Sequence, residues 1–278
     1  MGRHNKSKRP QLQDGTWRKR GAILAAVVSL AAALVGGLLV YFSLGQQSER
    51  LTTGDSAPGP ATAAIVDQLS LTFPNPTFVD TATSLLEQAG YAVDHYLGEE
   101  VTVEFYRDLP AHGYDLLLLR VHSGMAKDDG VSTNYVSLFT GEPFSEIFHD
   151  AETWEDAEAG RLGRARQRDG SPEYYSIVPD FIESSMRGRF EGTTVIMMGC
   201  DGLRTDATAE AFVRKGAKAV VGWSGPVSPS HTDEATQRLL QHLLIDGLAI
   251  QEAVRQTMAE VGPDPEYDSR LLVYQSKG

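Results

Sequence analysis

Hydrophobic positions divide the chain into three zones. Residues 22–44 form an apolar run without a charged side chain, residues 46–62 are polar and rich in Gly, Pro, Ser and Thr, and residues 63–278 alternate short apolar runs with segments of helical spacing. Apolar strands that alternate with amphipathic helices are typical of a mostly parallel sheet covered by helices. The pattern therefore predicts one membrane helix, one flexible spacer and one α/β domain.

Three apolar runs of the α/β domain are continuous enough to be buried central strands. They cover residues 114–121 (YDLLLLRV), 193–198 (TTVIMM) and 217–222 (AKAVVG). Further strands are expected over 65–72, 91–96 and 271–274, and helices over 77–90, 179–189, 206–215, 231–244 and 250–261. Residues 101–108 fit a strand or a helix, whereas 123–173 are expected to be irregular, with at most a short strand or hairpin near 135–139.

The apolar run at 22–44 is long enough to cross a hydrocarbon core of about 30 Å at roughly 1.5 Å per residue. Trp17 and Tyr41 stand where aromatic residues anchor a membrane helix. Basic residues precede the run, so the tail (1–20) is expected in the cytoplasm and the domain outside, with residues 21–45 as a single-pass anchor. A cleaved signal peptide is the alternative, although its apolar region is usually about 7 to 15 residues long.

The net charge of −12 hides an asymmetry. Residues 1–20 have a net charge of +6, which leaves −18 for the rest of the chain, and such an acidic body argues against nucleic acid as a partner. One cysteine excludes an intramolecular disulfide and a structural zinc site, and neither a metal nor a cofactor is expected. The pairs His231 with Asp233 and His242 with Asp246 are expected on exposed helix faces.

The two residues best suited to chemistry follow predicted central strands. His122 comes directly after 114–121, and Cys200 follows 193–198 with Gly199 between. Ligand sites gather at the carboxyl ends of strands in open α/β sheets, so neighbouring strands would place imidazole and thiol side by side. The histidine can take the thiol proton and return it to a leaving amine, while N–H groups near Gly124 and at Cys200 stabilise an oxyanion. Taken singly, a lone cysteine or a histidine at a strand end more often has a structural role than a catalytic one.

The segment from residue 193 to 255 carries a family resemblance. It begins TTVIMMGCDGLRT, continues through GAKAVVG and ends GLAIQEAVR, and it resembles the C-terminal half of the caspase–gingipain–separase superfamily, with CHAT domains and gingipain-type peptidases closest. YDLLLLRVHSG resembles the matching histidine strand, and the histidine precedes the cysteine as in that superfamily. The resemblance covers most of residues 63–278 and implies a caspase-like three-layer α/β/α sandwich with a mostly parallel central sheet.

The resemblance also implies roles for individual residues. Cys200 becomes the nucleophile, with its own amide as one oxyanion donor, and His122 becomes the general base and acid. The strand and loop GWSGP would pair with substrate and shape the specificity pocket, which makes Trp223 and Ser224 candidates for that pocket. Asp201, in the turn after the nucleophile, is a further candidate.

The sequence departs from the family pattern at two points. Ser123 stands between His122 and Gly124, where the family usually has glycine directly after the histidine, and no family-matched residue orients the His122 ring. The alternative to an enzyme is therefore an inactive relative that binds or senses at the cell envelope. A serine hydrolase is not indicated, because Pro226 replaces the last glycine of a G-x-S-x-G elbow.

A basic segment, GRLGRARQR, lies between the two candidate catalytic residues. Its arginines, Arg161, Arg164, Arg166 and Arg168, mark a candidate processing loop that a trypsin-like activity, including the protein's own, would cut. A plain surface loop is the alternative, and the stronger one. Together these features predict a membrane-tethered cysteine endopeptidase that cleaves a peptide or protein substrate through a thioester intermediate.

Overall fold

The computed structural model describes residues 59–128, 131–147 and 150–275, and Pro60 onward belongs to one compact unit. The predicted cytoplasmic tail, the membrane helix at 22–44 and most of the spacer lie outside the described residues. Within the described part, no helix combines the length and the apolar character needed to span a bilayer.

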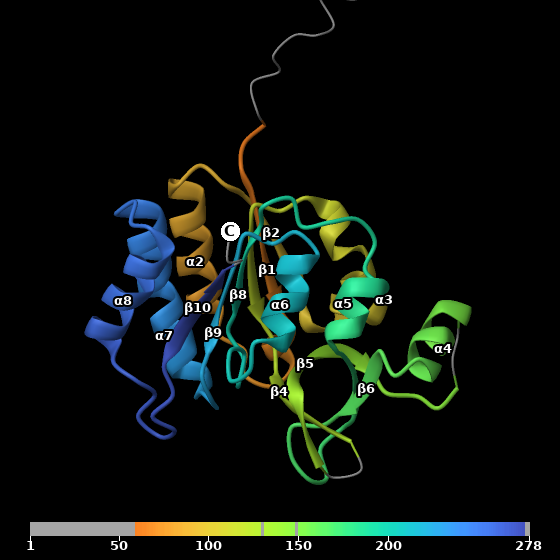
Figure 1. Ribbon diagram of the computed structural model, residues 1–278. Helices are drawn as coiled ribbons and strands as arrows, with labels where there is room; N and C mark the ends of the chain where they lie inside the picture. The colour runs from red at the N-terminus through yellow and green to blue at the C-terminus, as the bar shows by residue number, and fades with distance from the viewer. Residues whose placement is uncertain (1–58, 129–130, 148–149, 276–278) are drawn as a thin grey trace, which may run out of the picture. The chain divides into compact units, whose positions relative to one another are not determined.

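Six strands form a central sheet in the order β10-β9-β8-β3-β1-β2 (Figure 1). Their bounds are β1 Thr62–Asp67, β2 Ala92–Leu97, β3 Leu116–Arg120, β8 Thr194–Met197, β9 Ala219–Trp223 and β10 Leu271–Gln275. Neighbouring strands run parallel, except that β10 pairs antiparallel with β9. The structure therefore confirms an α/β fold with a mostly parallel sheet.

Helices cover both faces of this sheet, which is why all five positions of β3 are buried (Figure 1). One apolar core lies beneath α2 (Pro76–Gln88), α7 (Pro229–Leu240) and α8 (Ile250–Val261), and a second beneath α3 (Val103–Asp108), α5 (Pro179–Ser184) and α6 (Ala207–Arg214). Short 3₁₀ turns occupy Gln68–Leu71, Gly98–Glu100 and Leu109–His112. Strand β3 reads as a continuous apolar run because it has no solvent-facing side.

Local sequence signals explain where α2 begins and which face it buries. The Asn75 side chain accepts a hydrogen bond from the Phe78 N–H at 3.1 Å, and a proline follows at the first helical position. Phe78, Ala82 and Leu86 are buried at four-residue spacing. The predicted helix at 77–90 is therefore confirmed, with its start one residue earlier.

The strand allowed near 135–139 lies within a longer strand, but the prediction that the rest of 123–173 is irregular is wrong, because this region supplies three of the four strands of a second sheet. Its strands are β4 Ser123–Asp128, β5 Val131–Pro143, β6 Leu162–Ala165 and β7 Tyr174–Ile177, in the antiparallel order β4-β5-β7-β6, with α4 (Ala151–Glu158) between β5 and β6. Ser137 and Thr140 are buried in β5 beside apolar neighbours, and the Thr140 hydroxyl donates to the Tyr175 carbonyl at 2.9 Å. Because these polar residues are buried, β5 lacks the alternation of apolar and polar residues by which a strand is predicted.

The expected exposure of two histidine–aspartate pairs is also wrong. His231, Asp233 and His242 are buried, and only Asp246 is exposed. Helix α7 packs against both α2 and α8, so its buried face is wider than that of a surface helix. His242 lies in a π-helical turn, Gln241–Ile245, that continues α7. Its Nδ1 lies 2.8 Å from Asp246 Oδ2.

Candidate functional site

A groove of about 1170 Å³ lies at the carboxyl ends of the central strands. Segments that follow β1, β3, β8 and β9 all reach it, and the second sheet closes its other side. The strand order reverses between β1 and β3, and ligands bind at such a switch point in open α/β sheets. The topology alone thus makes this groove the candidate ligand site.

Strand pairing brings the two candidate catalytic residues to the same rim. In the parallel pair β3–β8, Leu119 lies opposite Met197. His122 follows Leu119 by three residues and Cys200 follows Met197 by three, and both line the groove. The predicted neighbourhood of the two strands is confirmed. Gly124 and Gly199, expected near an oxyanion, line the groove as well.

His122 is held at its backbone and at its ring. Its N–H donates to Gln68 Oε1 at 2.9 Å, and its Nε2 lies 2.9 Å from the Thr72 hydroxyl. The rings of Phe73 and Phe139 lie 6.0 and 5.7 Å from the imidazole. Burial, together with the nearby charge of Arg120, lowers the pKa of His122 from 6.5 to about 4, so the imidazole is neutral at neutral pH.

Arg120 fixes the segment that holds His122. Its fully buried guanidinium donates to both carboxylate oxygens of Asp233 at 2.8 Å and to Asp67 at 2.6 Å. It also donates to the Phe73 carbonyl at 2.8 Å. One side chain therefore connects the end of β3 to helix α7 and to the turn after β1, which carries Thr72.

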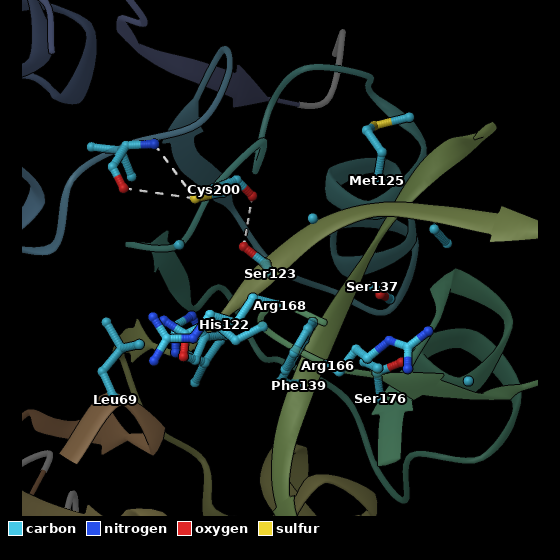
Figure 2. A pocket seen from close by; sticks show the side chains of 18 of the residues that line it. Leu69, His122, Ser123, Met125, Ser137, Phe139, Arg166, Arg168, Ser176 and Cys200 are labelled. Atoms are coloured by element: carbon cyan, nitrogen blue, oxygen red, sulfur yellow. Dashed lines mark hydrogen bonds between the residues drawn. The ribbon is translucent and has the colours of Figure 1, made fainter. Parts of the chain in front are cut away.

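Cys200 contacts the loop after β9. Its Sγ accepts a hydrogen bond from the Val227 N–H at 3.4 Å and lies 3.7 Å from the Val227 carbonyl oxygen (Figure 2). Burial, with smaller contributions from nearby carboxylates, raises the pKa of the thiol above its ordinary value of 9.0. No hydrogen bond joins the His122 ring to this thiol, although both residues lie in the described part of the chain. The resting site thus holds a neutral thiol and a neutral imidazole.

The segments that follow β3 and β8 approach each other closely because Gly199 has no side chain. A Cβ at this position would overlap the Val121 carbonyl oxygen and the Ser123 hydroxyl. Ser123, which departs from the family pattern, donates its hydroxyl to the Cys200 carbonyl at 2.7 Å (Figure 2). The extra residue after His122 therefore connects the imidazole segment to the thiol segment.

Trp223 and Ser224, two of the candidates for the substrate pocket, do not line the groove. Trp223 is completely buried, and its indole N–H donates to the Thr232 hydroxyl at 2.9 Å. Ser224 does not line the groove, and its N–H donates to the Arg270 carbonyl at 2.9 Å. Strand β9 has β8 on one side and β10 on the other, so its edge is not free to pair with a substrate strand.

Asp201 shapes the turn after the nucleophile rather than lining the groove. Its backbone adopts a left-handed conformation with φ of 62°, and its N–H donates to the Gly225 carbonyl at 2.8 Å. Its buried carboxylate accepts a hydrogen bond from Arg204 at 3.1 Å. The side chain therefore stabilises the bend that presents Cys200.

The predicted loop at 160–168 contains a strand. Leu162–Ala165 forms β6, and Arg161, which does not line the groove, pairs with the buried Asp156 at 2.7 Å. Arg164, Arg166 and Arg168, by contrast, do line the groove. In the sequence these arginines lie between His122 and Cys200. Only the structure shows that they line the same groove as those two residues.

Thr72 and Gln68 are the site residues that the sequence did not reveal. Both follow β1, which ends at Asp67, whereas the sequence predicted a strand through residue 72. Knowledge of the β1–β3 switch point would have drawn attention to this turn.

No family model matches this chain, and no curated protein matches it either. Among the described residues, no group of three metal-ligating side chains is close enough to hold an ion. The chemistry that the groove can support is therefore derived from its own residues, a thiol and an imidazole at adjacent strand ends.

Proposed function

We propose that this protein is a cysteine endopeptidase with a caspase-like fold, tethered to a membrane by residues 22–44. The observation that carries the proposal is that adjacent parallel strands bring His122 and Cys200 into one groove at the sheet's switch point. The groove volume of about 1170 Å³ exceeds that of most small-molecule pockets, which favours an extended peptide as substrate.

The proposed reaction begins when Cys200 Sγ attacks a peptide carbonyl carbon. His122 accepts the thiol proton and returns it to the amine nitrogen as the C–N bond breaks, which leaves a thioester on Cys200. The Cys200 N–H is the proposed donor to the oxyanion. Water then hydrolyses the thioester, with His122 as the base.

The pKa values favour proton transfer during the attack over a preformed ion pair. A neutral thiol with a raised pKa and a neutral imidazole with a lowered pKa do not exchange a proton at rest. Substrate binding must bring the thiol to the His122 ring, where a neutral base is ready to accept the proton.

The first test compares two thiol reagents. A peptide acyloxymethyl ketone alkylates Cys200 fast only with help from the histidine, whereas iodoacetamide alkylates any accessible thiol. We expect the ketone to label the wild type at least about 100-fold faster than His122→Ala, the scale of general-base assistance. Iodoacetamide should label both proteins similarly, and Cys200→Ala should remain unlabelled. His112→Ala, an exposed histidine outside the groove, is the matched control.

A binding or sensing module is the second candidate, and it is favoured by the lack of a hydrogen bond between the His122 ring and the thiol among the described residues. This candidate predicts equal ketone labelling of the wild type and His122→Ala. That result would overturn the proposed peptidase.

A further inference from the structure

The wall of the groove that contacts the Cys200 thiol is built from two loops. The loop after β9 contains Val227, whose N–H donates to Cys200 Sγ at 3.4 Å (Figure 2). The loop before β10 contains Glu266 and Tyr267, which line the same groove. These residues belong to no helix or strand, so the positions of the two loops depend on the contacts between them.

Asp264 joins these two loops. Its Oδ2 accepts a hydrogen bond at 2.8 Å from the N–H of Ser228, the residue directly after Val227. Its Oδ1 accepts from the N–H groups of Glu266 and Tyr267 at 2.9 and 3.0 Å. One carboxylate therefore fixes both loops, and through Ser228 it fixes the residue that contacts the thiol.

The Asp264 carboxylate is both buried and charged. Only 1% of the residue is exposed. Burial acts to raise its pKa, but the main-chain N–H donors outweigh that effect, and the pKa lies below its ordinary value of 3.8. The group is therefore ionised at neutral pH. Because a buried charge depends on its hydrogen-bond donors, movement of either loop away from the carboxylate is disfavoured.

A second contact fixes the loop after β9 on the other side of Val227. The Ser269 hydroxyl donates to the Pro226 carbonyl at 2.5 Å. Ser269 is itself fixed by Asp264, whose N–H donates to the Ser269 carbonyl at 2.9 Å. The loop is thus held at Pro226 and at Ser228, and Val227 between them presents its N–H to the thiol.

We propose that Asp264 is a positioning residue for the Cys200 thiol and that it acts by holding the Val227 N–H against Sγ. The inference rests on the proposed peptidase and adds a residue that supports its nucleophile. When His122 takes the thiol proton, the thiolate forms with an N–H donor already in contact. A hydrogen bond to an anion is stronger than one to a neutral thiol, so this contact favours the charged form that attacks the peptide.

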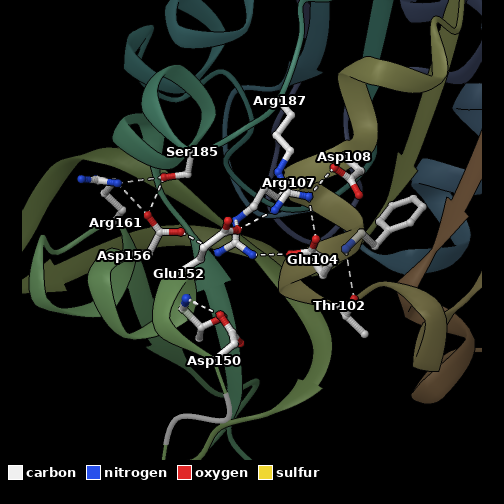
Figure 3. Close-up of polar contacts among 12 residues, drawn as sticks. Thr102, Glu104, Arg107, Asp108, Asp150, Glu152, Asp156, Arg161, Ser185 and Arg187 are labelled. Carbon is white, nitrogen blue, oxygen red and sulfur yellow. Dashed lines mark hydrogen bonds and ion pairs between the residues drawn. The ribbon is translucent and has the colours of Figure 1, made fainter.

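Two variants break the contact in different ways. Ser228→Pro deletes the N–H that donates to Asp264 and keeps the carboxylate, and Ser228 already has a φ of −71°, which proline adopts. Asp264→Asn removes the charge and replaces one accepting oxygen with an amide that cannot accept. Asp156→Asn is the matched control. Asp156 is also buried and accepts from Arg107 and Arg161, but it does not line the groove (Figure 3).

The first measurement is the pKa of the thiol, from the rate at which iodoacetamide alkylates Cys200 in the full-length protein at increasing pH. Burial raises this pKa, the Val227 N–H lowers it, and the carboxylates of Asp201 and Asp264 raise it. Ser228→Pro keeps both carboxylates, so loss of the N–H contact should raise the pKa above the wild-type value. An unchanged pKa, or a fall toward the ordinary value of 9.0 as the loop opens to water, would overturn the inference.

The second measurement is the rate of labelling by the peptide acyloxymethyl ketone, which depends on the positions of both Cys200 and His122. We expect Ser228→Pro and Asp264→Asn each to slow it about 10-fold or more, the scale of one lost hydrogen bond to a charged group. Asp156→Asn should leave the thiol pKa unchanged and alter this rate by less than about twofold. If all three variants slow labelling equally, the rate follows the stability of the domain, and Asp264 has no positioning role.

The two measurements separate this inference from the proposed function. A raised thiol pKa in Ser228→Pro supports the positioning role even if His122 gives no assistance and the ketone reacts no faster than iodoacetamide. An active peptidase whose thiol pKa and ketone labelling are the same in both variants as in the wild type keeps the proposed function and overturns the inference. If Asp264→Asn does not fold, Ser228→Pro decides, because it keeps the carboxylate and its other two donors.

Discussion

The imidazole of His122 uses one nitrogen for Thr72 and leaves the other for chemistry. Its Nε2 lies 2.9 Å from the Thr72 hydroxyl. If Nδ1 is to accept the Cys200 proton, Nε2 must carry the ring proton and donate it to that hydroxyl. Thr72 therefore orients the His122 ring through Nε2, a role that the family resemblance did not assign to any residue.

The lowered pKa of His122 makes stability depend on pH in a defined window. Burial lowers this pKa from 6.5 to about 4 in the folded chain. Between pH 6.5 and 4 the unfolded chain binds a proton that the folded chain does not, so the free energy of unfolding falls as pH falls. The loss is complete once the pH is below the folded value.

We expect His122→Gln to flatten this dependence. Urea unfolding of the wild type and the variant is compared at pH values from 7 to 4. The wild type should lose more stability across the window than the variant, because glutamine binds no proton there. Parallel stability curves would contradict the lowered pKa of His122.

At the scale of elements, ion pairs join the carboxyl end of β3 to β1 and α7. Arg120 is completely buried, and its partners Asp67 and Asp233 belong to β1 and α7. Its guanidinium also lies over the Phe78 ring of α2 at 5.5 Å. The pairing of elements around the groove thus depends on one residue that the sequence pattern showed only as the next-to-last position of an apolar run.

Removal of this charge should be costly. Arg120→Met keeps an unbranched side chain but leaves Asp67 and Asp233 buried without their partner, and we expect a loss of about 3–5 kcal/mol in the free energy of unfolding. Arg238→Met, at an exposed α7 position, should change stability by less than about 0.5 kcal/mol. Urea denaturation measures both, and an equal effect of the two substitutions would contradict the role given to Arg120.

The secondary structure of the central sheet could be predicted from sequence, whereas that of the second sheet could not. Strand β3 is buried on both faces, so its apolar run is visible in the sequence. Strand β5 buries Ser137 and Thr140, whose polar atoms find partners on other strands. A strand that satisfies its polar side chains through tertiary contacts carries no hydrophobic signature of its own.

At the scale of the whole molecule, the sequence combines an acidic body with a basic N-terminal tail. The tail and the apolar run at 22–44 lie outside the described residues, and the tether stays a prediction from sequence. Its physical basis is the length of the run and the excess of basic residues before it.

Deletion of residues 1–45 tests the tether. We expect the full-length chain to remain in the membrane pellet after carbonate washing and the truncated chain to be soluble. Labelling of Cys200 should be the same in both, because Pro60 onward belongs to a compact unit of its own. A mature protein whose N-terminus lies beyond the apolar run at 22–44 would show a cleaved signal peptide instead.

The sequence by itself determined where most strands and helices of the central sheet lie, and that His122 and Cys200 each follow a buried strand. Periodicity and strand ends are local properties, so a single chain displays them. Only the tertiary structure decided that Thr72 holds the imidazole, that Trp223 is buried away from the groove, and that Arg166 and Arg168 line it. Each of these facts depends on contacts between segments far apart in the chain, which no local pattern encodes.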